Sequence, residues 1–229
     1  HPYMVSRPVD KVGYIVITSD RGLAGGLNIN LFKALSKSIQ QYQDQSVQAE
    51  FAVIGAKGVS FFKNFGDKVT SAVTDYGDKP TFEQLNAPVQ AMLEDYSNGK
   101  LDRIYVVYNQ FVNAMTQKPI VNQLVPLPEG SFGDEESGIQ TELSWDYIYE
   151  PDIKTLIDEL LGRYIESIVY QAVMENIASE QSSRMVAMKA ATDNAGDLIN
   201  DLQLVYNKLR QAAITREISE IVGGAAAVS

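Results

Sequence analysis

The C-terminal third of the chain most constrains its fold, because no proline occurs between residues 152 and 229. Most of this stretch has apolar residues at helical spacings, and one continuous helix here would be roughly 115 Å long at about 1.5 Å per residue. One domain of ordinary size cannot bury so long a helix. We therefore expect much of it to face another helix or another protein.

The apolar pattern changes along this predicted helix. Between residues 153 and 173 the stripe is broad, which is typical of a helix face packed on a domain. Its members are Ile153, Leu156, Ile157, Leu160, Leu161, Tyr164, Ile168, Val169 and Ala172. Further on, apolar residues follow alternating steps of four and three, the seam of a left-handed two-stranded coiled coil. This seam consists of Leu198, Leu202, Val205, Leu209 and Ala212.

An α-helical bundle is the alternative interpretation of this segment, with turns near Gly162 and Gly196. An isolated glycine costs a helix only about 1 kcal/mol, and neither glycine is accompanied by a proline or an Asn-Gly turn signal. The pattern therefore favours one long helix. No second helix of comparable length is expected in the chain to pair with the seam.

Composition excludes several classes of chemistry. The 229 residues include no cysteine and one histidine, His1, so disulfides, thiol nucleophiles and histidine-based catalysis or metal binding are not expected. The net charge of −10 argues against a nucleic-acid partner, which would require a basic surface. Neither a signal peptide nor a membrane span is indicated. We expect no catalytic residue, no metal and no cofactor. We expect the partners of the chain to be proteins.

The N-terminal part alternates between strand and helix patterns. Strands are predicted at residues 12–18, 50–54, 68–74, 103–111 and 119–127. Helices are predicted at residues 29–42, capped by Asn28, in a short stretch after Gly55 and Gly58 that ends at about Phe65, and at 82–96. This order predicts a Rossmann-like α/β domain with a mainly parallel sheet, helices on both faces and an antiparallel hairpin at one edge, its turn at residues 113–117. The domain spans residues 1–128, an acidic loop residues 129–151, and the long helix residues 152–229.

A glycine-containing loop, residues 19–26, follows the first strand where a phosphate-binding loop would lie. The loop has no Gly-Lys-Ser/Thr, and Gly22, Gly25 and Gly26 do not have the G-x-G-x-x-G spacing. We interpret these glycines as permitting a tight turn and close packing. A nucleotide-binding α/β enzyme with a helical tail is the alternative function, and a coiled-coil scaffold is another.

Three separate segments closely resemble the gamma subunit of F-type ATP synthases, in particular its gammaproteobacterial members. They are residues 17–30 (ITSDRGLAGGLNIN), 175–196 (ENIASEQSSRMVAMKAATDNAG) and 214–227 (ITREISEIVGGAAA), and the similarity extends over essentially the whole chain. The resemblance implies a non-catalytic central rotor shaft that couples ion flow through the c-ring to ATP synthesis or hydrolysis. It implies two long helices wound as an antiparallel coiled coil inside the ring of alternating alpha and beta subunits.

The resemblance also implies partners and contact residues. The N-terminal helix of the family would pair with the seam, and we interpret the chain as a fragment that lacks roughly the first 60 residues, from the helix length needed. The implied partners are the alpha, beta, epsilon and c subunits, at the cytoplasmic side of the bacterial inner membrane. Contacts with the alpha/beta ring are implied for Arg184, Gln211, Thr215 and Arg216. Contacts of the foot with the c-ring and epsilon are implied for Tyr147, Tyr149 and Glu150.

Overall fold

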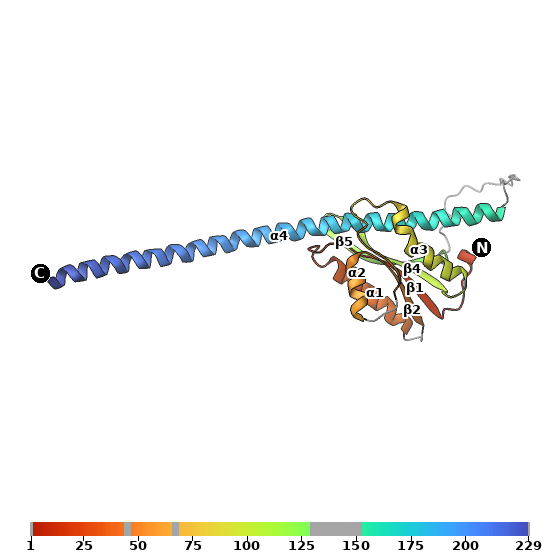
Figure 1. Ribbon diagram of the computed structural model, residues 1–229, viewed down its shortest axis with the longest axis horizontal. Coiled ribbons are helices and arrows are strands. Elements are labelled where there is room, and N and C mark those ends of the chain that lie inside the picture. The colour runs from red at the N-terminus through yellow and green to blue at the C-terminus, as the bar shows by residue number, and fades with distance from the viewer. Residues whose placement is uncertain (1, 44–46, 66–68, 129–152, 229) are drawn as a thin grey trace, which may run out of the picture. The chain divides into compact units, whose positions relative to one another are not determined.

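The computed structural model describes residues 2–43, 47–65, 69–128 and 153–228 (Figure 1). The chain divides into two units, His1–Arg184 and Met185–Ser229. The first unit therefore includes the beginning of the C-terminal helix, whereas the sequence placed that helix in a segment of its own. The elements, in order, are η1 (Pro2–Met4), β1 (Lys11–Ile17), α1 (Leu27–Gln43), β2 (Gln48–Ile54), α2 (Ala56–Phe65), β3 (Val69–Val73), α3 (Phe82–Ser97), β4 (Arg103–Asn113), β5 (Thr116–Val125) and α4 (Ile153–Val228).

The sheet has five strands in the order β3-β2-β1-β4-β5. The pairs β1–β2, β1–β4 and β2–β3 are parallel, and only β5 runs antiparallel, to β4. β1 lies at the centre, and six of its seven residues are buried because helices cover both faces of the sheet. The predicted Rossmann-like fold with an antiparallel hairpin at one edge is confirmed.

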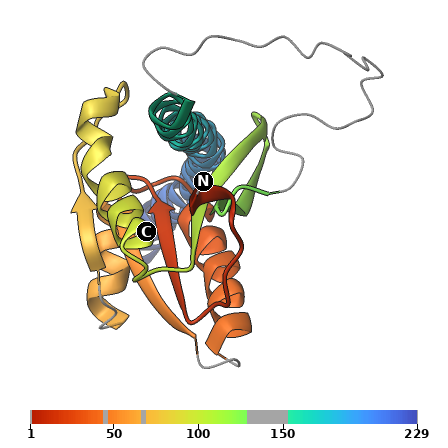
Figure 2. The same cartoon turned by 90° about the vertical axis from the view of Figure 1, so that its right-hand side faces the viewer.

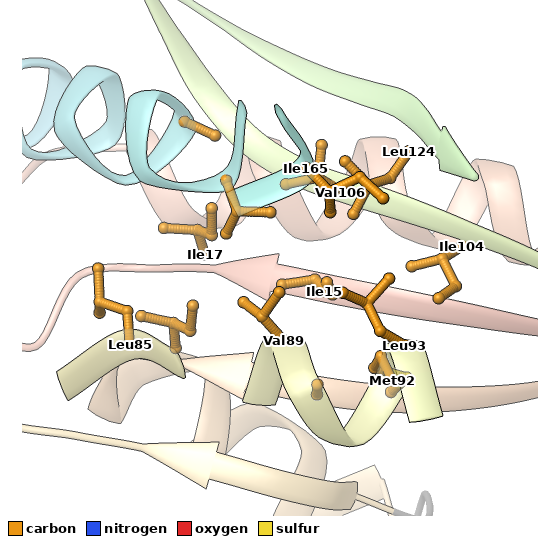
Figure 3. Packing of buried hydrophobic residues seen from close by; sticks show 14 of the residues in the cluster. Ile15, Ile17, Leu85, Val89, Met92, Leu93, Ile104, Val106, Leu124 and Ile165 are labelled. Carbon is orange, nitrogen blue, oxygen red and sulfur yellow. The ribbon is translucent and has the colours of Figure 1, made fainter. Parts of the chain in front are cut away.

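Each face of the sheet has its own apolar core, and Figure 2 shows α1 and α3 on opposite sides of β1. On one face, α1 and α2 pack on the sheet through Leu31, Leu35 and Phe62. On the other face, α3 packs beside the first part of α4. Figure 3 shows Ile165 of α4 next to Val106 and Leu124 of the sheet. The long helix is thus part of the core of the first unit.

The buried face of α4 differs from the predicted stripe. It consists of Leu161, Ile165, Val169, Ala172, Val173 and Ile177, of which three were not in that stripe. Ile157 and Leu160 are 40% and 59% exposed, so the prediction is wrong for these two residues. Leu160 lies about 100° around the helix from Leu161, off the line that faces the sheet, and Ile157 is one turn before the contact begins.

The start of α1 also differs from the prediction. The helix begins at Leu27, so Asn28 is inside its first turn and is not its N-cap. The Asn28 side chain bonds instead to Ser19, in the loop that follows β1. Residue type alone does not separate the two roles, because a short polar side chain at a helix start can cap the helix or bond to a neighbouring loop.

Gly55, directly after β2, has a backbone conformation that only glycine adopts easily. Its φ is +108°, and a Cβ built on it would lie 2.2 Å from the carbonyl oxygen of Thr18. Thr18 is itself held in place, since its Oγ1 donates to the Ile54 carbonyl and accepts from the Gly58 amide. A side chain at residue 55 therefore has no space to occupy.

We expect Gly55→Ala to destabilise the first unit by about 3 kcal/mol or more, because backbone strain and a clash with Thr18 act together. Gly99→Ala is the matched control: its φ is +72°, but nothing lies within 4 Å of the added Cβ. The control should cost only about 1–2 kcal/mol of backbone strain. Urea unfolding measures both, and equal losses in the two variants would contradict the steric argument.

Tyr14 is the largest fully buried side chain of β1. Its ring stacks on Phe51 and Tyr105, with centroids 5.8 Å and 5.6 Å away, and its hydroxyl lies 3.0 Å from Ser38 Oγ. Burial raises the pKa of Tyr14 to about 12, because the charged phenolate would lose its hydration. The native state thus keeps this proton at pH values where the unfolded chain, with a tyrosine pKa of about 10, releases it.

We therefore expect stability to fall as pH rises from about 10 to 12, because there the unfolded state binds fewer protons than the native state. Between pH 9 and 11 the free energy of unfolding should fall by about 1.4 kcal/mol less in Tyr14→Phe than in the natural chain. Ser38→Ala removes the same hydrogen bond but keeps the phenol, so its alkaline loss should match that of the natural chain. Urea unfolding at both pH values measures this, and identical losses in all three proteins would be the contrary result.

Candidate functional site

The carboxyl ends of β1, β2 and β3 form the edge of the sheet at which ligands bind in open α/β folds. The loop of residues 19–26 lies at this edge and is held by its own side chains. Ser19 Oγ donates to the Arg21 carbonyl at 2.8 Å and accepts from Asn28 Nδ2 at 2.7 Å. The Ser19 amide donates to Asn28 Oδ1 at 3.3 Å. These bonds fix the loop against the first turn of α1.

Asp20 occupies the position where a ligand's anion would bind. Its Oδ1 accepts from the amide of Ala56, the first residue of α2, at 2.8 Å, and its Oδ2 accepts from the amide of Tyr76 at 3.1 Å. The N-terminus of a helix favours an anion because its amides are free and its dipole is positive there. The protein's own carboxylate satisfies this end of α2, which supports a structural role for the loop.

Tyr76 closes the same edge from the segment after β3. Its hydroxyl donates to the Thr18 carbonyl at 2.8 Å. Burial raises the pKa of Tyr76 well above its ordinary value, and the nearby carboxylates of Glu180 and Asp20 raise it further. The phenol therefore stays protonated and keeps donating at any physiological pH.

Arg184, one of the predicted ring contacts, lies on α4 at this edge and its guanidinium is used within the chain. Nε and Nη2 donate to the Gly22 carbonyl at 3.4 Å and 3.3 Å, and Nη1 donates to Gln181 Oε1 at 3.2 Å. Nη2 also forms an ion pair with Glu180, and the Arg184 side chain is 21% exposed. The structure thus gives Arg184 a role in joining α4 to the loop of residues 19–26. A contact with the ring stays a prediction.

A second junction between α4 and the sheet was not foreseen from the sequence. Asn176 and Ser179 of α4 are fully buried and bond to Asn109 of β4. Asn176 and Ser179 therefore lie on the same face of α4 as the buried apolar residues between Leu161 and Ile177. The available signal was their position on that face, but nothing in the sequence identified a partner.

An open groove of about 760 Å³ lies between α1 and α2 on the outer side of the sheet. Its walls include Phe32 and Phe61, which stack with ring centroids 3.9 Å apart. Leu23 and Ile29 also line it and are 74% and 60% exposed, and three lysines surround these apolar residues: Lys33, Lys37 and Lys57. This surface has the character of a protein contact rather than a nucleotide site.

The second unit consists of the distal part of α4, and all its side chains from Met188 to Ala226 are exposed in the single chain. The predicted seam residues Leu198, Leu202, Val205 and Leu209 are between 54% and 66% exposed. The other predicted ring contacts, Gln211, Thr215 and Arg216, are exposed as well. Arg216 pairs with Glu220 at 3.1 Å, and Ser219 donates to the Thr215 carbonyl.

The remaining predicted sites have no geometry to report. Tyr147, Tyr149 and Glu150 lie outside the described residues. Within the described ranges, no group of three or more acidic or histidine side chains is arranged to hold a metal ion. Of the helices in those same ranges, none combines the length and apolarity that crossing a membrane requires.

Comparisons with known proteins identify the family. The family model described as ATP synthase matches residues 1–228. The chain is 94% identical to an ATP synthase gamma chain of Psychrobacter arcticus over 229 residues, which are 100% of this chain and 78% of that protein. It is 64% identical to an ATP synthase gamma chain of Acinetobacter baumannii over 228 residues, again 100% of this chain and 78% of the relative.

Solved structures support the fold. A chain of the Euglena gracilis mitochondrial ATP synthase in rotational state 3 matches with a TM-score of 0.70 and 24% identity, covering 96% of this chain and 73% of that chain. A chain from the central stalk and c-ring of the Tetrahymena thermophila mitochondrial ATP synthase matches with a TM-score of 0.60 and 22% identity, covering 82% and 79%. By its sequence matches over its whole length, the chain belongs to the ATP synthase gamma chain family.

Proposed function

We propose that this chain is the central rotor shaft of an F-type ATP synthase and is not itself catalytic. The observation that carries the proposal is the 94% identity to an ATP synthase gamma chain across the whole chain. The partners are the alpha, beta, epsilon and c subunits. The complex belongs at the bacterial inner membrane, with this subunit peripheral on the cytoplasmic side.

The second unit has the physical properties that a shaft requires. Its seam residues expose more than half of their surface in the single chain, and an isolated helix is marginal in water without a packed partner. The N-terminal helix of the family is the partner that completes the coiled coil. Gln211, Thr215 and Arg216 then lie on the part of the shaft that contacts the alpha/beta ring.

The shaft acts by biasing binding equilibria rather than by chemistry. An asymmetric shaft contacts the three catalytic beta subunits differently, so each subunit is stabilised in a different nucleotide-binding state. A contact shifts a subunit only by its differential free energy between the states. About 5.5 kcal/mol of difference is needed to change a two-state population from 1:99 to 99:1. Rotation of the shaft moves these biases from one subunit to the next.

The first unit connects this shaft to the membrane side. Tyr147, Tyr149 and Glu150 belong to the foot that rests on the c-ring beside epsilon. Ion flow through the c-ring turns the foot during ATP synthesis, and ATP hydrolysis in the alpha/beta ring turns it in reverse.

The groove between α1 and α2 suits a contact with an acidic protein surface. The lysines around it are exposed to solvent, on a chain whose net charge is −10.

The function is tested by reconstituting the full-length chain with alpha and beta subunits. We expect the chain to raise the ATPase turnover of the ring and to rotate within it, as seen by a load attached to the chain. Calorimetry of the chain alone with ATP, ADP and NAD is the control for the nucleotide-enzyme alternative, and no binding is expected. ATPase turnover that is the same with and without the chain would refute the rotor role.

The seam is tested by the double variant Leu202→Asp and Leu209→Asp in the full-length chain. Each substitution places a charge in the apolar contact between two helices, so we expect the coiled coil to lose about 3 kcal/mol or more per site. Asn207→Asp adds the same charge at a position that faces away from the seam and should change stability by less than about 0.5 kcal/mol. Thermal unfolding followed by circular dichroism separates the two cases. Equal effects would mean that the seam has no helical partner.

A further inference from the structure

The first part of α4 lies on the sheet through two kinds of contact. The apolar contact comprises Ile165, Val169, Ala172, Val173 and Ile177, and Leu161 is buried one turn before them. Apolar contacts stabilise in proportion to buried area and have no preferred direction. They hold the helix on the sheet and oppose any rotation that would expose these residues. Directional bonds fix the rotation of the helix about its own axis more narrowly.

Such bonds follow the apolar contact along α4, in the turns that precede Met185. Asn109 of β4 donates to Asn176 Oδ1 from its side-chain Nδ2 at 3.0 Å and from its backbone amide at 3.3 Å. Ser179 Oγ donates to the Asn109 carbonyl at 2.9 Å. We call Asn176, Ser179 and Asn109 the polar lock. All three residues are buried, so water does not compete for these bonds.

The polar lock depends on the position of α4 because Asn109 needs its partners. The backbone N–H and C=O of a strand residue point to the same side, and both of these groups of Asn109 bond to α4, the N–H to Asn176 Oδ1 and the C=O to Ser179 Oγ. Turning α4 by one residue position, about 100°, would move both α4 side chains away and leave buried peptide groups of Asn109 unpaired.

Asn176 indicates that the contact serves positioning more than stability. Its Oδ1 accepts two hydrogen bonds from Asn109, and its side chain also lies within hydrogen-bonding reach of the Tyr76 hydroxyl. A buried polar contact stabilises little more than well-packed apolar residues of similar size. Buried polar groups of this kind are best known for fixing the register of packed helices.

Arg184 adds a second attachment further along α4. Its bonds to the Gly22 carbonyl join the helix to the loop after β1, whereas Asn109 lies in β4. Ser183 bonds to Gln117 of β5 at 2.9 Å. Between residues 176 and 184 the helix is therefore held by polar bonds to β4, to the loop after β1, to β5 and, through Gln181 and Asp78, to the segment after β3. Nearer its start, Tyr170 donates to the Pro80 carbonyl and Glu166 accepts from Gln90, both at 3.5 Å.

We propose that the polar lock of Asn176, Ser179 and Asn109 is the torsional joint through which torque passes between the sheet domain and α4. This inference rests on the proposed rotor function. The apolar contact holds the helix on the sheet, and the polar lock prevents the helix from turning against the sheet under load. Asn176 and Ser179 are thus positioning residues of the shaft.

The test uses the full-length chain assembled with alpha and beta subunits. A load can be attached to the sheet domain through the variant Lys63→Cys, because Lys63 is at an exposed position of α2. The 229 residues contain no cysteine, so this thiol is the single attachment point among them. With the ring fixed, torque from ATP hydrolysis reaches this load through the contacts between α4 and the sheet, in parallel with the peptide chain that joins the sheet domain to its helices. The measurements are ATPase turnover without load and slippage, meaning ATP hydrolysed without rotation of the load.

Ser179→Ala should raise the slip rate under load by about fivefold, the effect of one lost hydrogen bond, and leave the unloaded ATPase unchanged. Asn176→Leu combined with Ser179→Ala should slip still more. Ser179→Thr keeps the hydroxyl and should restore the load-bearing behaviour. Ser167→Ala, at an exposed position of α4, is the matched control and should behave like the natural chain.

The outcomes separate the two proposals. If the natural chain neither stimulates the ATPase nor rotates the load, the rotor function is wrong. If the natural chain rotates the load and Ser179→Ala and the double variant do so without extra slippage, the rotor function holds and the polar lock is wrong. Circular dichroism checks that the variants fold, and Ser179→Ala decides the question alone if the double variant does not fold.

Discussion

The fold of the first unit depends on the burial of one face of α4 against the sheet. Five apolar residues of that face lie within the core that also contains Ile15, Val106 and Leu124. Fully burying an apolar side chain stabilises by about 1.5–3 kcal/mol, so this face contributes on the order of ten kcal/mol. That is comparable to the net stability of a whole domain. The sheet domain therefore cannot be separated from the start of the shaft without exposing its own core.

One helix meets two environments along its length, and the pattern of its side chains changes accordingly. Between Leu161 and Glu180, buried residues recur at steps of three and four on one side. From Met188 to Ala226 every side chain is exposed in the single chain, including large apolar residues such as Leu204 and Ile221. Exposed apolar surface of this extent marks an interaction site in a soluble protein. The distal part of α4 is built to be covered by other chains or helices.

Much of the fold could be predicted because its signals are local. The buried run of β1 and the alternation of strands and helices depend on neighbouring residues, and they predicted the sheet and the edge hairpin correctly. The closure of the sheet edge could not be predicted in this way. Asp20 bonds to Tyr76 across 56 positions, and Asn109 bonds to Asn176 across 67. Such pairs appear only when the chain is folded, because residue type alone does not select a polar partner.

Asn28 and Arg184 illustrate the same limit. Residue type predicts Asn28 as a helix cap, and the resemblance implies a ring contact for Arg184, and each side chain is bonded within the chain to the loop after β1. The cap is not formed by Asn28, whereas the ring contact of Arg184 stays a prediction. The seam stays a prediction: a repeat of three and four indicates that a helix will pair with another, and the seam residues are exposed in the single chain. Periodicity indicates which faces are buried, whereas the identity of a polar partner depends on tertiary structure.

The carboxyl edge of the sheet explains how a Rossmann-like fold can serve without chemistry. In such folds this edge binds a ligand because helix amides and strand ends are left unsatisfied there. Here Asp20 satisfies the start of α2, Tyr76 satisfies Thr18, and Arg184 of α4 satisfies Gly22. The groups that would hold a nucleotide instead hold the loop and the helix. A shaft needs a stiff attachment between domain and helix, and the edge that could have been an active site provides part of it.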